Sequence, residues 1–382
     1  MSEPVAHTPS APAGLRPAVR AWARPARRPA VVAAFAGAAV LPLLVAEGSP
    51  ALDNMVLTAT YVTMALGLNV VVGFAGLLDL GYVAFFAIGA HVTATFASTF
   101  WAGAGGGDGL AILVGGPVAH APGIHVNFLL VALLALAATT TAGVLIGVPT
   151  LRLRGAYVGI VTLAFGEIIG QVAANGADIH LFGGTLTAGP NGITPIDPID
   201  LPFLPRFDPL NLRPWYWFAL TLVAAMLLVS FRLRDSRIGR AWIALRDDEQ
   251  AAAAAGVPIA RAKLQAYGVG AALGGVTGAF LASYLRTVNP TQFTFSFSIF
   301  ILAMVVLGGL GSIWGAVLGA IVLSELNTWL LPGVLDGLPA RVGLDFDLSS
   351  VSSGLYGLLL VVVVLLRPEG LVPARRRGGR RG

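Results

Sequence analysis

Residues 232–263 read RLRDSRIGRAWIALRDDEQAAAAAGVPIARAK and form the longest charged stretch of a chain that is otherwise mostly apolar. A short helix is predicted inside this stretch. Asp247 or Asp248 can cap it, because a carboxylate accepts hydrogen bonds from the free N–H groups of a first helical turn. Glu249 adds a negative charge that suits the same end of the helix.

Five alanines, which have the highest helix propensity, follow at positions 251–255. Gly256 should end the helix and Pro258 should prevent it from resuming. Two helical turns are too short to be stable alone in water, so something must hold this helix in place. Two interpretations stay open: a surface helix that rests on its own transmembrane bundle, or a docking helix for a cytosolic partner.

The composition indicates a polytopic membrane protein. Of the 382 residues, 56% are hydrophobic and only 11% are charged, whereas soluble proteins carry about 25% charged residues. Cysteine is absent, which excludes a disulfide framework, a thiol nucleophile and a thiolate metal site. The net charge of +5 comes almost entirely from arginine, with Lys263 as the one lysine. The positive residues cluster at the termini and in short loops, which is typical of a topology signal and not of nucleic-acid binding.

A bilayer core about 30 Å thick needs roughly 20 apolar residues per helix. The first apolar run follows a basic segment, 1–29, that we interpret as a disordered cytosolic tail. We favour an uncleaved first helix over a signal peptide, because there is no clear small-x-small cleavage site and further spans follow. About ten spans are predicted, at Val31–Ala46, Asn54–Val72, Leu80–Phe100, Phe128–Val148, Ala156–Ala174, Trp215–Phe231, Leu264–Leu285, Ser298–Leu310, Ile313–Leu330 and Ser353–Leu366.

Loop charges support an even number of spans. With ten spans and a cytosolic N-terminus, Arg152, Arg154, the 232–263 stretch and the basic tail after Leu366 all lie on the cytosolic side. The predicted outer loops contain aspartates and few arginines; they are 101–126, 176–213, 286–297 and 331–352. We therefore predict an all-α polytopic membrane protein with both termini cytosolic, organised as a 30–373 permease domain and a basic 374–382 tail.

Glycine spacing predicts close helix packing. Two sets of small residues recur every four positions, a spacing that lets helix backbones approach one another in lipid: Gly270, Gly274 and Gly278, and Gly311, Gly315 and Gly319. Glycines also interrupt apolar sequence at 73–81 and 308–311. Such interruptions favour broken or re-entrant helices beside a transport path.

Polar residues within predicted spans are candidates for that path. Glu167 is followed by Gln171 and Asn175 at four-residue steps, so all three share one helix face. A carboxylate at this depth usually faces a cavity or a partner. The stripe forms either the wall of a solvated pathway or an interhelical hydrogen-bond network. Asn69 is a similar case, and Asp79 either lines the path or sits at the inner surface between spans.

Several motifs are missing or weak. The chain has no phosphate-binding G-x-x-x-x-G-K-[ST] sequence and no H-E-x-x-H sequence, so it cannot hold nucleotide in a P-loop, and no metal site or catalytic pair is predicted. A transporter with its own ATPase is excluded. The energy must come from an ion gradient or from a separate ATPase.

The outer loop 176–213 is rich in proline and glycine, including Gly189, Pro190, Asn191 and Gly192, and forms either a structural lid or a partner surface.

Eight stretches of the sequence resemble the LivM-type permeases of branched-chain amino acid ABC importers, and they occur in the family's order along the chain. They are GLNVVVG at 67–73, LG at 80–81 with AFFAIGA at 84–90, LRLRGAY at 151–157, IVTLAFGEI at 160–168, GPNGI at 189–193, SRIGRAW at 236–242 running into RDDE at 246–249, MVVLGGLGSIWG at 304–315, and RPEGL at 367–371. Jointly they are specific, although each alone is weak.

The resemblance implies a bacterial inner-membrane heterodimer with a second, similar permease, two cytosolic ABC ATPase subunits that carry the ATP, and an extracytoplasmic substrate-binding protein. It also implies a cytosolic coupling helix, which falls on Asp247, Asp248, Glu249, Gln250, Ala251, Ala252 and Gly256. Gln250 differs from the alanine of the family pattern. Asp79, Tyr82 and His91 stand where relatives often have serine, histidine and tyrosine.

These observations predict a permease subunit without catalysis of its own and without a bound cofactor, which translocates a branched-chain amino acid. Because of the departures at 79, 82 and 91, urea, short amides and aromatic acids stay open as substrates. Two other interpretations also remain. One is an ion-coupled secondary transporter that uses Glu167, and the other is a membrane scaffold without a path.

Overall fold

The computed structural model describes residues 27–102, 109–114, 121–153, 155–181, 184–201, 207–328 and 369–373, together with 354, 358 and 361–362. These residues are mainly helical. The helices are α1 (Arg27–Val40), α2 (Pro50–Leu68), α3 (Val83–Phe96), α4 (Phe128–Thr150), α5 (Ala156–Asn175), α6 (Arg213–Asp235), α7 (Arg237–Asp247), α8 (Glu249–Ala254), α9 (Ile259–Leu285), α10 (Phe295–Gly308) and α11 (Ile313–Glu325). Short helical turns are η1 (Leu41–Leu43), η2 (Asn69–Phe74), η5 (Gly176–Asp178), η6 (Gly189–Asn191) and η7 (Pro290–Gln292).

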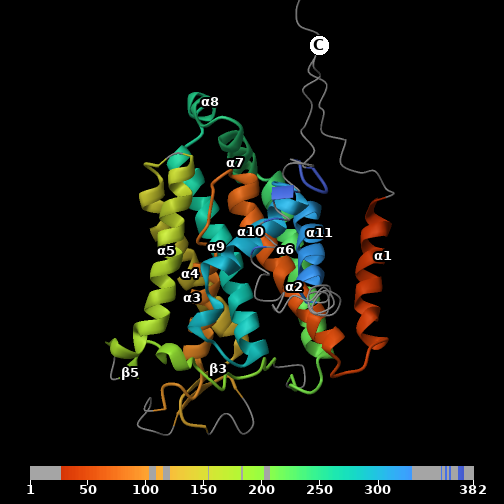
Figure 1. Ribbon diagram of the computed structural model, residues 1–382, viewed down its shortest axis with the longest axis vertical. Coiled ribbons are helices and arrows are strands. Elements are labelled where there is room, and N and C mark those ends of the chain that lie inside the picture. The colour runs from red at the N-terminus through yellow and green to blue at the C-terminus, as the bar shows by residue number, and fades with distance from the viewer. Residues whose placement is uncertain are drawn as a thin grey trace, which may run out of the picture.

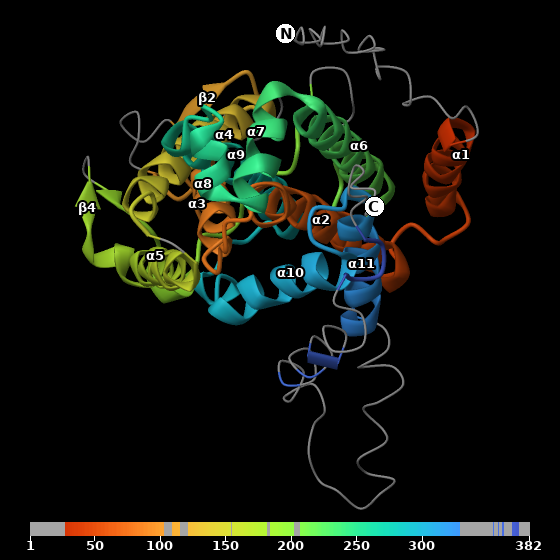
Figure 2. The ribbon, with the colours of Figure 1, turned by 90° about the horizontal axis from the view of Figure 1, so that it is seen from above.

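The bundle has two different ends (Figure 1). The short helices α7 and α8 lie at one end, which we call the α8 end. The strands lie at the opposite end, which we call the strand end. Seen from above, α1 and α5 lie at opposite sides of the bundle, with α2, α3, α4 and α9 between them and α10 and α11 along one edge (Figure 2).

Apolar helices account for nine of the ten predicted spans. Among the described residues, six helices are long and apolar enough to cross a membrane, and three shorter apolar helices accompany them at Ala33–Leu43, Val83–Phe96 and Ile313–Thr328. The prediction of a mainly helical, multi-pass membrane protein is thus confirmed. The tenth span, Ser353–Leu366, lies largely outside the described residues, as do the 1–26 and 374–382 tails. The count of ten and the location of the termini remain predictions.

The second and third spans are separated by an irregular segment. After Leu68 the α2 helix continues as the π-helical turn η2, and α3 begins only at Val83. The predicted span Leu80–Phe100 is therefore too long: α3 has 14 residues, which at ~1.5 Å per residue covers about 21 Å. Gly76 adopts φ +69° at the turn, a conformation that suits glycine because it lacks a Cβ atom.

A second break separates α10 from α11. Gly309 and Gly311 adopt φ values of +115° and +77°, so the helix cannot continue through them. The segment 369–373 lies against this break, where Leu371 N donates to Leu307 O at 2.8 Å and Val372 N donates to Gly308 O at 2.9 Å. Both glycine-interrupted stretches are therefore helix breaks, as their sequences predict.

Small sheets, built mainly from the predicted outer loops, lie at the strand end. Strand β3 (Ile124–Val126) pairs antiparallel with β1 (Ala97–Ser98) and parallel with β2 (Leu110–Ile112). Strands β4 (His180–Leu181) and β5 (Gly184–Thr185) form a separate hairpin. These five strands are the only departure from the all-α prediction within the described residues, and their pairing satisfies backbone groups outside the helices.

The first glycine set packs helix α9 against its neighbours. A Cβ atom at Gly270 would overlap Val71, one at Gly274 would press on Tyr82, and one at Gly278 would overlap the Phe86 carbonyl of α3. In the second set, Gly315 and Gly319 bring α11 against α10. Gly311 lies in the break before α11, so its expected place on the same helix face is corrected.

We expect Gly278→Ala to lower the free energy of unfolding by about 1–3 kcal/mol, because the added methyl group must displace the Phe86 backbone. Thermal unfolding of the detergent-solubilised protein measures this change. Gly37→Ala is the matched control, since no atom lies within 4 Å of a Cβ at this position of α1. The same substitution there should be neutral or stabilising. Equal melting temperatures for the two variants would contradict the packing role of Gly278.

Candidate functional site

The charged stretch forms two helices, where the sequence predicts one. Helix α7 precedes the predicted helix, and Ser236 caps it by accepting a hydrogen bond from Gly239 N at 3.0 Å. Gly239, Trp242 and Leu245 are buried. The sequence signal for α7 is the Ser236 cap followed by apolar residues at helical spacing.

Helix α8 matches the predicted coupling helix but is shorter than the expected Asp247–Gly256. Asp248, and not Asp247, caps it: one carboxylate oxygen accepts from Gln250 N at 2.8 Å and from Ala251 N at 3.0 Å. Gly256 adopts φ +84°, and Val257 N closes the end by donating to Ala252 O at 3.0 Å. The residue that ends the helix has a left-handed backbone conformation, which glycine adopts easily, so the helix ends at the glycine that the sequence predicts as its end.

Helix α8 is held by its own chain on one side, and its other side is exposed in the part of the chain that the structure describes. Ala252 is buried, whereas Gln250, Ala251, Ala253 and Ala254 are exposed. The Lys263 ammonium, itself buried, lies 2.9 Å from a Glu249 carboxylate oxygen. This ion pair ties α8 to the start of α9. The helix therefore rests on its own bundle by one face, and its role as a docking helix stays a prediction.

Asn69 links the two helix breaks. Its side chain is buried, and Oδ1 accepts a hydrogen bond from Gly311 N at 2.9 Å. A Cβ atom at Gly73 would overlap that side chain. Asn69 therefore holds η2 against the α10–α11 break, which the sequence suggested only as two separate interruptions.

Asp79 is buried in the irregular segment between η2 and α3, and whether it lines the path or sits at the inner membrane surface stays a prediction. Only 2% of the residue is exposed, and Oδ1 accepts a hydrogen bond from Gly81 N at 3.0 Å. The neighbouring Leu80 N donates to the Thr162 hydroxyl of α5 at 3.0 Å. Asp79 thus helps to fix the irregular segment between η2 and α3 against α5.

The polar stripe of α5 faces away from the chain's own bundle. Glu167, Gln171 and Asn175 are all exposed, and Asn175 Nδ2 donates to Gln171 at 2.9 Å and 3.2 Å. They therefore do not bond α5 to neighbouring helices of the described chain. The five proposed path residues fall into two groups, buried Asn69 and Asp79 and the exposed stripe, so they do not line one common cavity.

The outer loop is fastened to the bundle at its glycine motif. Gly189, Pro190 and Asn191 form the turn η6, and Gly192 places the chain beside the end of α9. Ile193 and Val288 then exchange two backbone hydrogen bonds of 2.9 Å and 3.1 Å. The motif thus anchors the loop that covers the strand end.

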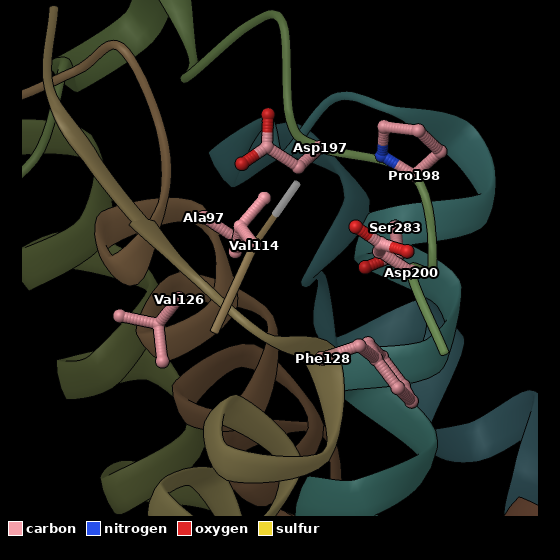
Figure 3. Close-up of a pocket in the computed structure, with 8 residues that line it drawn as sticks. All are labelled: Ala97, Val114, Val126, Phe128, Asp197, Pro198, Asp200 and Ser283. Carbon is pink, nitrogen blue, oxygen red and sulfur yellow. The ribbon is translucent and has the colours of Figure 1, made fainter. Parts of the chain in front are cut away.

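A buried histidine joins the two outer loops. His125 Nδ1 lies 2.7 Å from Asp197 Oδ2, and the His125 side chain is only 2% exposed. A small pocket beside this pair receives side chains from both loops and from α9 (Figure 3). It is lined by Ala97, Val114, Val126, Phe128, Asp197, Pro198, Asp200 and Ser283. Sequence reasoning missed this pair because its members are 72 positions apart.

We expect His125→Ala to destabilise the strand end by about 1–3 kcal/mol, because the substitution removes a hydrogen bond to a carboxylate. Proteolysis of reconstituted protein from the strand side should then cut the 184–201 loop faster. His180→Ala is the matched control, since His180 is exposed and contacts the Asp178 carbonyl at 3.3 Å. Unchanged cleavage of His125→Ala would show that the pair does not fasten the loops.

Comparisons with known proteins agree with the LivM resemblance. Residues 51–364 match the family described as "Branched-chain amino acid transport system / permease component". The Escherichia coli protein named "High-affinity branched-chain amino acid transport system permease protein LivM" is 35% identical over 366 residues, which cover 91% of this chain and 75% of the relative. A probable LivM of Methanocaldococcus jannaschii is 24% identical, over 82% of this chain and 91% of the relative.

A shorter match reaches the second type of permease. The LivH permease of Salmonella typhimurium is 31% identical over 148 residues, which cover 39% of this chain and 44% of the relative. No solved structure matches the chain. The family match, together with the helical bundle and its two breaks, shows that this chain belongs to the family of branched-chain amino acid transport system permease components.

Proposed function

We propose that this chain is one permease subunit of an ATP-driven importer in the bacterial inner membrane, with ATP bound and hydrolysed by two separate cytosolic ABC subunits. The observation that carries the proposal is α8. It is capped by Asp248, tied to α9 by the Glu249–Lys263 pair, and exposed along its alanine face. A short helix fixed at the rim of a membrane bundle is suited to insert into a groove of a partner protein.

The α8 end is inferred to be cytosolic, because the basic residues of the 232–263 stretch gather there. The strand end, closed by the outer loops, then faces the extracytoplasmic binding protein. This end has few arginines, and its aspartates are Asp178, Asp197, Asp200 and Asp208. This charge asymmetry supports the predicted orientation with both termini inside.

The exposed stripe of α5 supports a second permease subunit as partner. Glu167, Gln171 and Asn175 lie on a helix of which little is buried within this chain, and polar side chains facing lipid are costly. A partner helix or a water-filled path between the two subunits would satisfy them. The additional similarity to LivH permeases agrees with a pair of related subunits.

Branched-chain amino acids are the proposed substrates, as the names of the relatives indicate. The tagged protein should be purified from gently solubilised native membranes, and its co-purifying subunits identified. The complex should then be reconstituted with its binding protein and tested for uptake of labelled leucine, urea and phenylacetate. ATP-dependent leucine uptake is the expected result. A protein that purifies alone and transports only with a proton gradient would instead establish the ion-coupled alternative.

A further inference from the structure

Helix α7 is held against the start of α9 by a buried hydrogen bond. Trp242 is fully buried, and its Nε1 donates a hydrogen bond to the Ala262 carbonyl at 2.8 Å. Lys263, the next residue, pairs with Glu249 of α8 at 2.9 Å. These two contacts join α7, α8 and the first turn of α9, so that a force on α8 should move all three together.

Arg246 extends from the last turn of α7 to the end of the α2 span. Its Nη1 donates a hydrogen bond to the Gly73 carbonyl at 2.5 Å. Gly73 lies in η2, at the C-terminal end of a helix, where carbonyl groups lack partners within the helix and the helix dipole favours a cation. A charged donor from another helix is well suited to this position.

Two glycines, Gly76 and Gly311, make room for Arg246. A Cβ atom at Gly311 would overlap Nη1, and one at Gly76 would press on the Arg246 side chain and backbone. Gly73 supplies the acceptor. Because Gly311 N also donates to Asn69 Oδ1 at 2.9 Å, the guanidinium lies where η2 and the α10–α11 break meet.

We propose that Arg246 is the positioning residue that transmits movement of the coupling helix to the two paired helix breaks. The inference rests on the proposed function, in which ATPase subunits move α8. Since α7 is clamped to α8 and α9, its displacement carries the guanidinium with it. The Gly73 carbonyl and the Gly311 backbone must then shift together or lose their contact with it.

The test uses the complete transport complex, in which Arg246→Gln removes the charge. Coupling between two sites commonly changes equilibrium binding affinity by roughly 5- to 150-fold. With an effect in the lower part of this range as the guide, leucine transport should fall by about tenfold while ATP hydrolysis and subunit co-purification persist. Arg246→Lys should recover part of the transport, because its ammonium can still donate to the Gly73 carbonyl. Arg240→Gln is the matched control, since Arg240 Nη1 bonds to the Asp235 carbonyl at 2.8 Å on an exposed face.

Two cysteine probes separate the inference from the proposed function, because the native chain contains no cysteine. In inside-out vesicles, Ala254→Cys reports on docking at α8, and Leu310→Cys, at a residue 37% exposed, reports on the break. A maleimide should label position 254 slowly when ATPase subunits are bound, and ATP should change the labelling rate at 310. Arg246→Gln should abolish only the second effect.

The possible results lead to different conclusions. If position 254 is not protected with native Arg246, the docking role of α8 fails and the inference fails with it. If 254 is protected but ATP still changes labelling at 310 in Arg246→Gln, the proposed function stands and Arg246 is not the transmitting residue. Loss of ATPase subunits from Arg246→Gln would also overturn the inference, since Arg246 would then serve docking.

Discussion

The double substitution Ala251→Glu/Ala254→Glu should release the ATPase subunits and abolish ATP-driven transport. Both alanines are exposed on α8, whereas Ala252 is buried and the Glu249–Lys263 pair holds the helix to α9. Unpaired carboxylates in an interface cost several kcal/mol, and about 1.4 kcal/mol corresponds to tenfold in affinity. Co-purification of the ATPase should therefore fall at least about tenfold.

The folded permease should be little affected, because glutamate is a good helix former and both positions are exposed. Its melting temperature and the co-purification of the second permease should stay the same. Ala260→Glu, at an exposed position in the first turn of α9, is the matched control and should retain the ATPase. Full retention by the double variant would move the ATPase contact away from α8.

Asn69→Ala should destabilise the bundle and stop transport. The buried Gly311 N–H would lose its acceptor, and an unsatisfied buried donor costs about 1–3 kcal/mol. The α10–α11 break would also lose its link to η2. Thermal unfolding in detergent and uptake by the reconstituted complex measure the two effects.

Asn175→Ala provides the comparison for stability. Among the described residues, the Asn175 amide bonds only to Gln171, on the exposed face of α5, so its removal should change stability by no more than about 0.5 kcal/mol. If both variants unfold at the same temperature, the Asn69–Gly311 hydrogen bond is not what joins the breaks.

Local sequence was sufficient to predict α8 and the two breaks. Asp248 caps its own helix, and Gly256, Gly309 and Gly311 adopt backbone conformations that other residues rarely adopt. Such features depend on a few consecutive residues, so a sequence carries them directly. Apolar run length likewise located nine apolar helices among the described residues, six of them long enough to cross a membrane.

The direction in which a helix face points, and the contacts between residues distant in sequence, could not be predicted in the same way. The stripe of Glu167, Gln171 and Asn175 was recognised as one helix face, but only the packed bundle showed that this face points away from the chain's own helices. Arg246 looked like one more cytosolic charge that orients the protein. Its contact with Gly73, 173 positions away, depends on the room that Gly76 and Gly311 leave beside the Arg246 side chain.

The sequence by itself therefore determined the membrane class, the apolar helices, the short helix α8 and the breaks, because hydrophobic length, capping and glycine conformation are local properties. The tertiary structure decided which breaks meet, how α7 and α8 are clamped to α9, and which polar residues are buried or exposed. Those outcomes depend on contacts between side chains that are distant in sequence. Many such contacts are possible, and the sequence alone does not show which of them form.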